Sequence, residues 1–206
     1  MLAAYRPRFR HELRTEWAAA LLYRPVSLLL TPLFAACRVP PLAVTLAGAA
    51  CALALPLLAI AGRGSTAIGV AAIAFCIFDC MDGDLARSTG RVSAAGAYAD
   101  FVVDLVYRAA FYAAIGFLWS AYAGLALGLA CALVAIVARA CRLYLPAETG
   151  QPGLAFSVVS GLDHLLPVAL VVLGALDALG ALLAYLVVYS LGDFILTQRS
   201  VLARLR

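Results

Sequence analysis

Four aspartates stand close together in a sequence that is otherwise strongly apolar. Asp79 and Asp82 are three residues apart, and Asp100 and Asp104 are four apart, so the members of each pair share one face of a helix. A charge at membrane depth costs about 2.5–3.5 kcal/mol on insertion scales, and carboxylates in apolar helices therefore indicate function. Carboxylate oxygens are ligands that Mg2+, Mn2+ and Ca2+ prefer. The spacing predicts that the four aspartates converge on a divalent cation.

Three further residues beside the aspartates suit a ligand that contains phosphate. Gly83 and Gly96 lack side chains, which lets a ligand or a backbone approach closely. Arg87 can bridge phosphate oxygens. A metal held by carboxylates, together with Arg, commonly stabilises the charge on a transferring phosphoryl group. Ordinary helix packing would explain either glycine taken alone.

The composition shows which elements must position these residues. Of the 206 residues, 66% are hydrophobic and 13% are charged, whereas soluble domains average about 45–50% apolar and about 25% charged residues. We therefore expect an all-α integral membrane protein. The net charge of +4 comes from arginines dispersed between apolar stretches, and this dispersal argues against nucleic acid as a partner.

Six apolar stretches are long enough to be membrane-spanning helices, which need roughly 20 residues each. A shorter segment, 23–37, mixes polar and leucine residues and is expected to form an amphipathic helix in the membrane interface. We divide the chain into an N-terminal segment (1–41), a six-helix catalytic domain (42–198) and a short tail (199–206). The six predicted spans are 42–60, 67–86, 93–119, 122–145, 154–173 and 179–197.

The arginines predict how the spans are oriented. Thirteen of them fall in the N-terminal segment, the second connection, the region between spans four and five, or the C-terminal tail. Arg63 lies in a connection on the opposite side, and Arg108 lies within the third span. The positive-inside rule then places both termini at the cytoplasmic side. The expected location is the cytoplasmic membrane of a bacterium or archaeon.

The segment 79–104 reads DCMDGDLARSTGRVSAAGAYADFVVD and matches the pattern D-x2-D-G-x2-A-R-x8-G-x3-D-x3-D. This pattern is the signature of the CDP-alcohol phosphotransferase family, and the chain therefore resembles members of that family. A weaker match precedes it: family members often have P-N-x-x-T, and residues 41–45 read PLAVT, with Leu42 in place of Asn. All eight fixed positions of the main signature are present, namely Asp79, Asp82, Gly83, Ala86, Arg87, Gly96, Asp100 and Asp104.

The resemblance implies a homodimer with a polar cavity that opens to the cytoplasmic side. It implies that Asp79, Asp82 and Asp100 hold a two-metal centre of Mg2+ or Mn2+, which binds the CDP pyrophosphate. Asp104 would also touch the metal region and would act as the general base toward the acceptor hydroxyl. The residues expected to contact the nucleotide are Asp79, Gly83, Ala86, Arg87, Gly96 and Thr45.

Residues in the later spans are candidates for binding the acceptor alcohol. Arg139 and Arg142 lie near the end of the fourth span, and Asp163 and His164 lie in the fifth. Topology-setting charge is the simpler explanation of the two arginines, and a hydrogen-bonded structural role is the simpler explanation of His164. The start of the fifth span has no Arg or Lys, which weighs against a phosphorylated acceptor. The spacing lets Arg108 pair with a carboxylate, while Asp84 and Asp193 have no assigned role.

The favoured function is transfer of a phosphatidyl group from CDP-diacylglycerol to an acceptor alcohol, with release of CMP, in phospholipid biosynthesis among membrane lipids. In the alternative, a CDP-linked small polar alcohol donates to a lipid or an inositol-phosphate-type acceptor. A cation transporter is the non-enzyme alternative, since intramembrane carboxylates also bind transported ions. Transporters often show paired halves with broken helices, and no such repeat is evident in this sequence.

Overall fold

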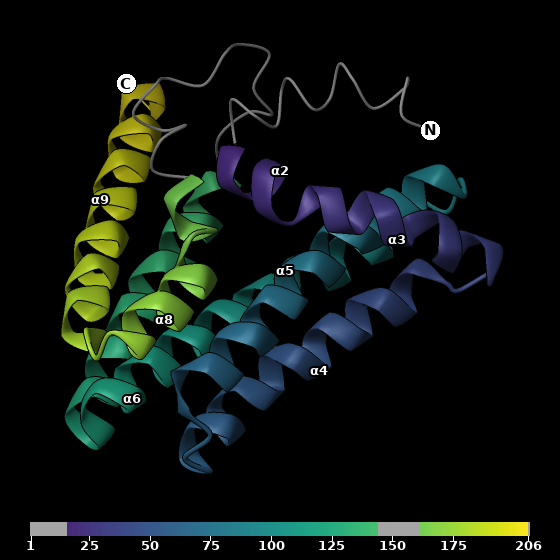
Figure 1. Ribbon diagram of the computed structural model, residues 1–206. Coiled ribbons are helices and arrows are strands. Elements are labelled where there is room, and N and C mark those ends of the chain that lie inside the picture. The colour runs from purple at the N-terminus through teal and green to yellow at the C-terminus, as the bar shows by residue number, and fades with distance from the viewer. Residues whose placement is uncertain (1–15, 144–160, 206) are drawn as a thin grey trace.

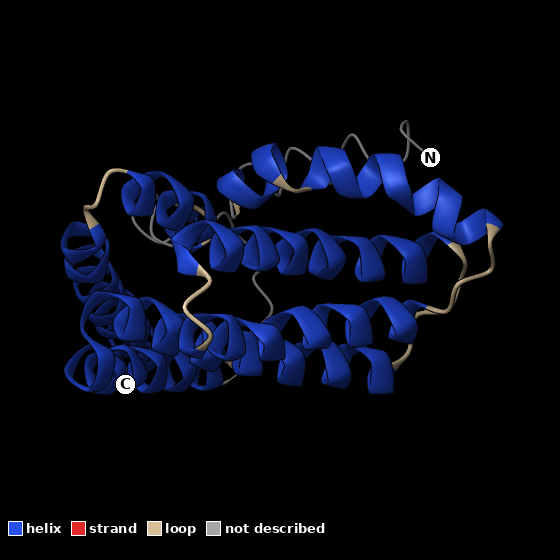
Figure 2. Ribbon diagram, turned by 60° about the horizontal axis from the view of Figure 1, so that its bottom comes forward, coloured by secondary structure: helices blue, strands red, loops and turns tan. Residues whose placement is uncertain are grey.

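The computed structural model describes residues 16–143 and 161–205. Helices make up nearly all of these two ranges, which contain no strand (Figures 1 and 2). The helices are α2 (Trp17–Leu22), α3 (Arg24–Ala36), α4 (Pro41–Ile60), α5 (Gly64–Ser88), α6 (Ala94–Arg142), α8 (Leu166–Ala175) and α9 (Leu179–Leu205).

Four of the described helices, α4, α5, α6 and α9, are long and apolar enough to cross a membrane. The shortest of them, α4, has 20 residues and is therefore about 30 Å long at 1.5 Å per residue. This length equals the hydrocarbon thickness of a typical bilayer. The expectation of an all-helical fold is confirmed for the described residues, and these four helices are compatible with an integral membrane protein.

Helix α6 folds back on itself at Ser120 and Ala121. Both residues have non-helical backbone angles, and Ala121 has a positive φ of 25°. The two halves of α6 on either side of this break pack closely. Their approach is so tight that a methyl group added at Gly116 would lie only 2.0 Å from the carbonyl oxygen of Gly124. Small residues allow helix backbones to approach in this way. The break falls between the third and fourth predicted spans, where the sequence predicts that one helix ends and the next begins.

The remaining predicted spans compare with the helices as follows. α4, α5 and α9 cover the predicted spans 42–60, 67–86 and 179–197. Only the part of the fifth predicted span from Gly161 onward is described, and its helix α8 has 10 residues, too few to cross a bilayer alone. Helix α9 continues to Leu205, so most of the predicted tail is helical. The count of six spans stays a prediction.

A buried apolar core joins α4, α5, both halves of α6, α8 and α9. At its centre, the rings of Phe75 and Tyr107 stack with their centroids 3.8 Å apart. Leu55, Ile68 and Leu186 are fully buried in the same cluster. This packing fixes α5 against the first half of α6, and these are the two segments that carry the aspartates.

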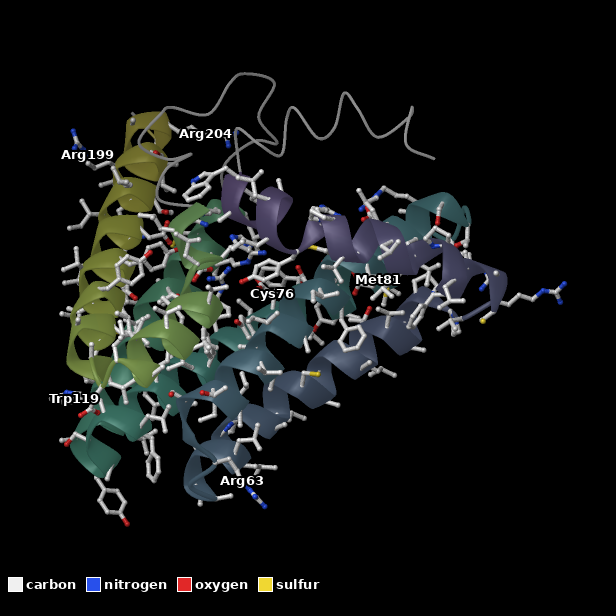
Figure 3. All side chains as sticks on the ribbon, in the orientation of Figure 1. Arg63, Cys76, Met81, Trp119, Arg199 and Arg204 are labelled. Carbon is white, nitrogen blue, oxygen red and sulfur yellow. The ribbon has the colours of Figure 1, made fainter. Side chains whose placement is uncertain are left out.

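Helices α2 and α3 lie across one end of the bundle, where the C-terminal end of α9 is also found (Figure 1). Arg199 and Arg204 project from this end, and Arg63 projects from the opposite one (Figure 3). The two labelled C-terminal arginines therefore lie at the end opposite to Arg63, an arrangement compatible with the positive-inside pattern.

Helix α3 places its polar residues inward. Arg24, Ser27 and Thr31 are its buried residues, whereas Leu29 is 78% exposed and Leu33 is 59% exposed. The bounds of α3 agree with the amphipathic segment predicted at 23–37. Its polar stripe faces the protein, however, and its exposed leucines are free to contact lipid.

Candidate active site

A cavity of about 150 Å3 opens where α4 begins, α5 ends and α6 begins. The last turns of α5 and the first turns of α6 are joined by a short connection, so residues separated in the sequence face each other across it. Six of the eight signature positions line the cavity. The lining residues are Thr45, Asp82, Gly83, Ala86, Arg87, Arg91, Val92, Ser93, Gly96, Ala97 and Asp100.

Thr45 and Asp82 connect α4 to the aspartate cluster. The Thr45 hydroxyl donates a hydrogen bond of 2.6 Å to Asp82 Oδ2. Both side chains are 6% exposed, and a hydrogen bond to a buried carboxylate is stronger than one between neutral groups. The structure therefore brings Thr45, which the weaker of the two sequence matches contains, directly to the predicted metal ligands.

Asp79 lies deeper than the main cavity. Together with Thr45, Asp82 and Asp100 it lines a smaller cavity that has no room for a water molecule. Asp79 also interacts electrostatically with Asp104, Asp100 and Asp82. Asp79 therefore lies within electrostatic range of the other three carboxylates, and their convergence on one cation stays a prediction.

Asp104 lies between two guanidinium groups. Its Oδ2 is 2.5 Å from Arg139 Nε and 3.6 Å from Arg108 Nε. Neither contact has hydrogen-bond geometry, so the buried Asp104 Oδ2 has ion-pair partners but accepts no hydrogen bond. A buried acceptor without a donor is costly, and this oxygen remains able to accept a proton or a ligand's hydrogen bond.

The four aspartates have the chemistry that suits a hard divalent cation. Four carboxylates supply oxygen ligands of the kind that Mg2+ and Mn2+ prefer, and one of them has a buried oxygen without a donor. In residues 16–143 and 161–205, no three acidic, histidine or cysteine side chains are gathered closely enough to enclose an ion. Asp82 and Asp104 point instead toward Thr45 and Arg139, respectively.

The open side of the cavity is suited to an anion. Arg87 folds over Gly83, since a methyl group at Gly83 would lie 3.0 Å from both terminal guanidinium nitrogens. Helix α6 begins at the cavity, and its N-cap Ser93 accepts a hydrogen bond of 3.0 Å from the Gly96 amide. The N-terminus of a helix favours negative charge. Arg87, Arg91 and the start of α6 therefore favour a phosphate group.

The predicted acceptor residues are held by internal partners. Arg108 pairs with Asp163, and the Tyr112 hydroxyl donates a hydrogen bond of 2.8 Å to the same carboxylate. Arg142 pairs with Asp193. Among the four predicted residues, Arg139 reaches the aspartate cluster directly.

His164 connects α8 to the N-terminal helices through its backbone. Its carbonyl oxygen accepts a hydrogen bond of 2.6 Å from the Tyr23 hydroxyl. This contact joins the region before α8 to the junction of α2 and α3, and so favours the structural role for the His164 backbone.

Sequence reasoning left Asp84 without a role and took Arg24 only as topology-setting charge, although the structure pairs the two beside the site. Asp84 Oδ2 accepts a hydrogen bond of 2.9 Å from Arg24 NH1, and Asp84 Oδ1 accepts one of 2.8 Å from Arg87. The sequence of α3 does indicate a buried contact, because Arg24, Ser27 and Thr31 recur at helical spacing on one face. A polar stripe in an apolar helix indicates a buried polar partner.

Comparison with known proteins agrees with the signature. The family model described as CDP-alcohol phosphatidyltransferase matches residues 38–191, well over half of the 206-residue chain. The match includes Thr45, the whole signature and all the predicted acceptor residues. No curated protein and no solved structure matches the chain significantly.

Proposed function

The chain belongs to the CDP-alcohol phosphatidyltransferase family, and from this premise we propose that it transfers a phosphatidyl group from CDP-diacylglycerol to an acceptor alcohol. CMP is the second product, and the reaction belongs to phospholipid biosynthesis. Family membership supports the general activity of a transferase of substituted phosphate groups. The observation that carries the proposal further is the cavity lined by six signature residues and Thr45.

In this proposal the nucleotide occupies the main cavity. Gly83, Ala86 and Gly96 present little side-chain bulk there, so the nucleotide can approach the backbone of α5 and α6. Arg87 and the N-terminus of α6 attract the pyrophosphate. Thr45 orients the carboxylate of Asp82 through its 2.6 Å hydrogen bond.

Asp79, Asp82 and Asp100 are the proposed ligands of a two-metal Mg2+ or Mn2+ centre, with Asp104 at its edge. When bound, the cations would neutralise charge on the pyrophosphate and on the departing CMP. Without the cations, the carboxylates of Asp82 and Asp100 would repel the pyrophosphate, because both side chains line the same cavity.

Asp104 is the proposed general base. Its buried Oδ2 accepts no hydrogen bond and would take the proton of the acceptor hydroxyl. The acceptor oxygen then forms a bond to the phosphorus that carries the diacylglycerol. The bond from that phosphorus to the oxygen bridging to CMP breaks, and CMP leaves with the electron pair. Arg139, 2.5 Å from Asp104, would stabilise the carboxylate before it takes the proton.

The acceptor is proposed to bind on the Asp104 side of the cluster, near Arg139, Arg142, Asp163 and His164. Of these residues, Arg139 is nearest to the proposed base. The partners of Arg142 and Asp163 place these two residues in ion pairs that shape the region. A CDP-linked small alcohol as donor remains the alternative, since the signature residues would contact the CDP part that both donors share.

We further propose six spans, with both termini and the active site at the cytoplasmic side, and a homodimer as the working assembly. The reversal in α6 and the position of Arg199 and Arg204 at the end opposite to Arg63 (Figure 3) support this topology. We propose the same division of the chain, into an N-terminal segment (1–41), a six-helix domain (42–198) and a tail (199–206).

The test is release of CMP by the purified protein. Radiolabelled CDP-diacylglycerol would be supplied in mixed micelles with a panel of polar alcohols, with and without phosphate groups. CMP release that depends on one alcohol, together with a labelled lipid product, supports the proposal. CMP release only from a CDP-linked small alcohol supports the alternative donor, and release from neither contradicts both.

A further inference from the structure

The polar face of helix α3 contacts a single buried carboxylate of α5, the helix that also carries Asp79 and Asp82. Asp84 of α5 is 8% exposed, and so is Arg24 of α3. Asp84 Oδ2 accepts hydrogen bonds from Arg24 NH1 at 2.9 Å and from Ser27 Oγ at 3.1 Å. Arg24 NH1 also donates to the backbone carbonyl of Cys80 at 3.1 Å. Several polar contacts therefore fix α3 to one turn of α5.

The other oxygen of the same carboxylate holds a residue of the nucleotide cavity. Asp84 Oδ1 accepts a hydrogen bond of 2.8 Å from Arg87 NH2, and the Arg87 side chain is 40% exposed. Arg87 lines the cavity, whereas Asp84 and Arg24 do not. One carboxylate oxygen of Asp84 thus contacts helix α3, and the other contacts a guanidinium that lines the cavity.

This arrangement limits where Arg87 can be. A long arginine side chain on a partly exposed surface has many rotamers, and fixing it before a ligand binds reduces the entropy lost on binding. The 2.8 Å contact with Asp84 draws the guanidinium across Gly83, which has no side chain to obstruct it. The carboxylate itself is held in place by Arg24 and Ser27.

Apolar contacts support the same coupling. Met81 and Leu85, on the turns around Asp84, are fully buried and pack with Leu30 and Phe34 of α3. Met81 lies directly beneath α3 (Figure 3). Leu29 and Leu33 of the same helix are exposed instead, so a displacement of α3 would be transmitted to the turns of α5 that carry Asp84.

We propose that Asp84 is a positioning residue that couples helix α3 to the nucleotide cavity through Arg87. It holds the guanidinium ready for the phosphates of the CDP-linked donor, and Arg24 acts on donor affinity only through it. This inference rests on the proposed function, because it takes the anion bound at Arg87 to be the donor's pyrophosphate.

A double-mutant cycle on CDP affinity tests the coupling, using the full-length protein in detergent with Mg2+ and titration calorimetry. Asp84→Asn keeps the shape and loses the charge, and it should weaken CDP binding about tenfold. Arg24→Gln should also weaken CDP binding, although it leaves the cavity lining unchanged. In an Arg87→Gln background, both substitutions should change CDP affinity less than twofold.

Matched variants separate this outcome from a general loss of structure. Arg38→Gln removes an exposed arginine just after α3 and should leave CDP affinity unchanged. Asp84→Glu keeps the charge and should recover much of the affinity that Asp84→Asn loses. If Asp84→Asn does not fold, the Arg24→Gln and Arg87→Gln cycle alone decides the question.

Two results would overturn the inference. One is that Asp84→Asn and Arg24→Gln leave CDP affinity unchanged while Arg87→Gln lowers it. The other is that their effects simply add to that of Arg87→Gln, which would show that they act independently of Arg87. A wild-type protein that does not bind CDP would instead contradict the proposed function.

Discussion

Thr45 of α4 donates a 2.6 Å hydrogen bond to Asp82 of α5, although 37 positions separate the two residues. This contact ties the helix before the signature to its second carboxylate. Both groups are buried, so the hydroxyl determines which way the Asp82 carboxylate points inside the site.

Replacing Thr45 tests that role. Thr45→Val has nearly the same shape but removes the donor, and losing a hydrogen bond to a buried charged group costs roughly 1.5–3 kcal/mol. We expect CDP affinity at fixed Mg2+ to fall by at least tenfold. Thr45→Ser retains the hydroxyl and is the matched control. Equal affinities for the two variants would show that the hydroxyl does not orient Asp82.

Activity should require a divalent cation. Four neighbouring carboxylates would repel a pyrophosphate unless a cation neutralises them. Excess chelator should abolish CMP release, and Mg2+ or Mn2+ should restore it. The control is a matched amount of chelator already saturated with Mg2+. Full activity in free chelator would contradict the two-metal proposal.

The reversal of α6 should be sensitive to side-chain size. In Gly116→Ala the new methyl group would lie 2.0 Å from the Gly124 carbonyl oxygen, and overpacking of this kind typically costs about 1–3 kcal/mol. We expect a lower thermal unfolding midpoint in detergent. Gly192→Ala is the matched control, because nothing lies within 4 Å of its new methyl group. Equal loss in both variants would mean that the two halves of α6 do not pack closely.

The termini should lie on the same side of the membrane as the site. Arg63→Cys and Arg204→Cys, each in a background without native cysteines, place thiols at opposite ends of the bundle (Figure 3). A membrane-impermeant thiol reagent applied to sealed vesicles should label one of them and spare the other. A tag at the N-terminus should behave as Arg204→Cys does. Labelling of both variants from one side would contradict the proposed topology.

The sequence predicted the position of the aspartates better than the surroundings that hold them. Helical spacing placed Asp79 with Asp82 and Asp100 with Asp104, and in the structure Asp79 interacts electrostatically with the other three. The break between the third and fourth predicted spans also appears, at Ser120 and Ala121. These features are local, because they depend on periodicity within one helix or on the end of one apolar stretch.

The contacts between helices could not be predicted in the same way. In a membrane both the protein interior and the lipid are apolar. An apolar helix face therefore does not indicate whether it packs against protein or against lipid. The inward polar face of α3 followed from its partner Asp84, which lies 60 positions away in the sequence. The pairing of Arg139 with Asp104 depends similarly on how the two halves of α6 are staggered. Helical periodicity alone carries no information about either distance.

The aspartates are proposed to have two different roles, metal binding and proton transfer. Asp79 is proposed as a metal ligand, and Asp104, with its donor-free buried Oδ2, as the base. Asn at either position keeps an oxygen of similar reach but loses the charge and the basicity. The two substitutions should therefore affect binding and turnover differently.

The most direct test measures CDP affinity at saturating Mg2+ beside turnover for Asp79→Asn and Asp104→Asn. Asp79→Asn should weaken CDP binding strongly. Asp104→Asn should retain much of the CDP affinity, with some loss because it lies at the edge of the metal centre. Its turnover should fall by about 10²–10⁴-fold, the usual cost of losing general-base catalysis. Near-normal turnover in Asp104→Asn, or a loss of CDP binding as complete as in Asp79→Asn, would contradict the assignment of Asp104 as the base.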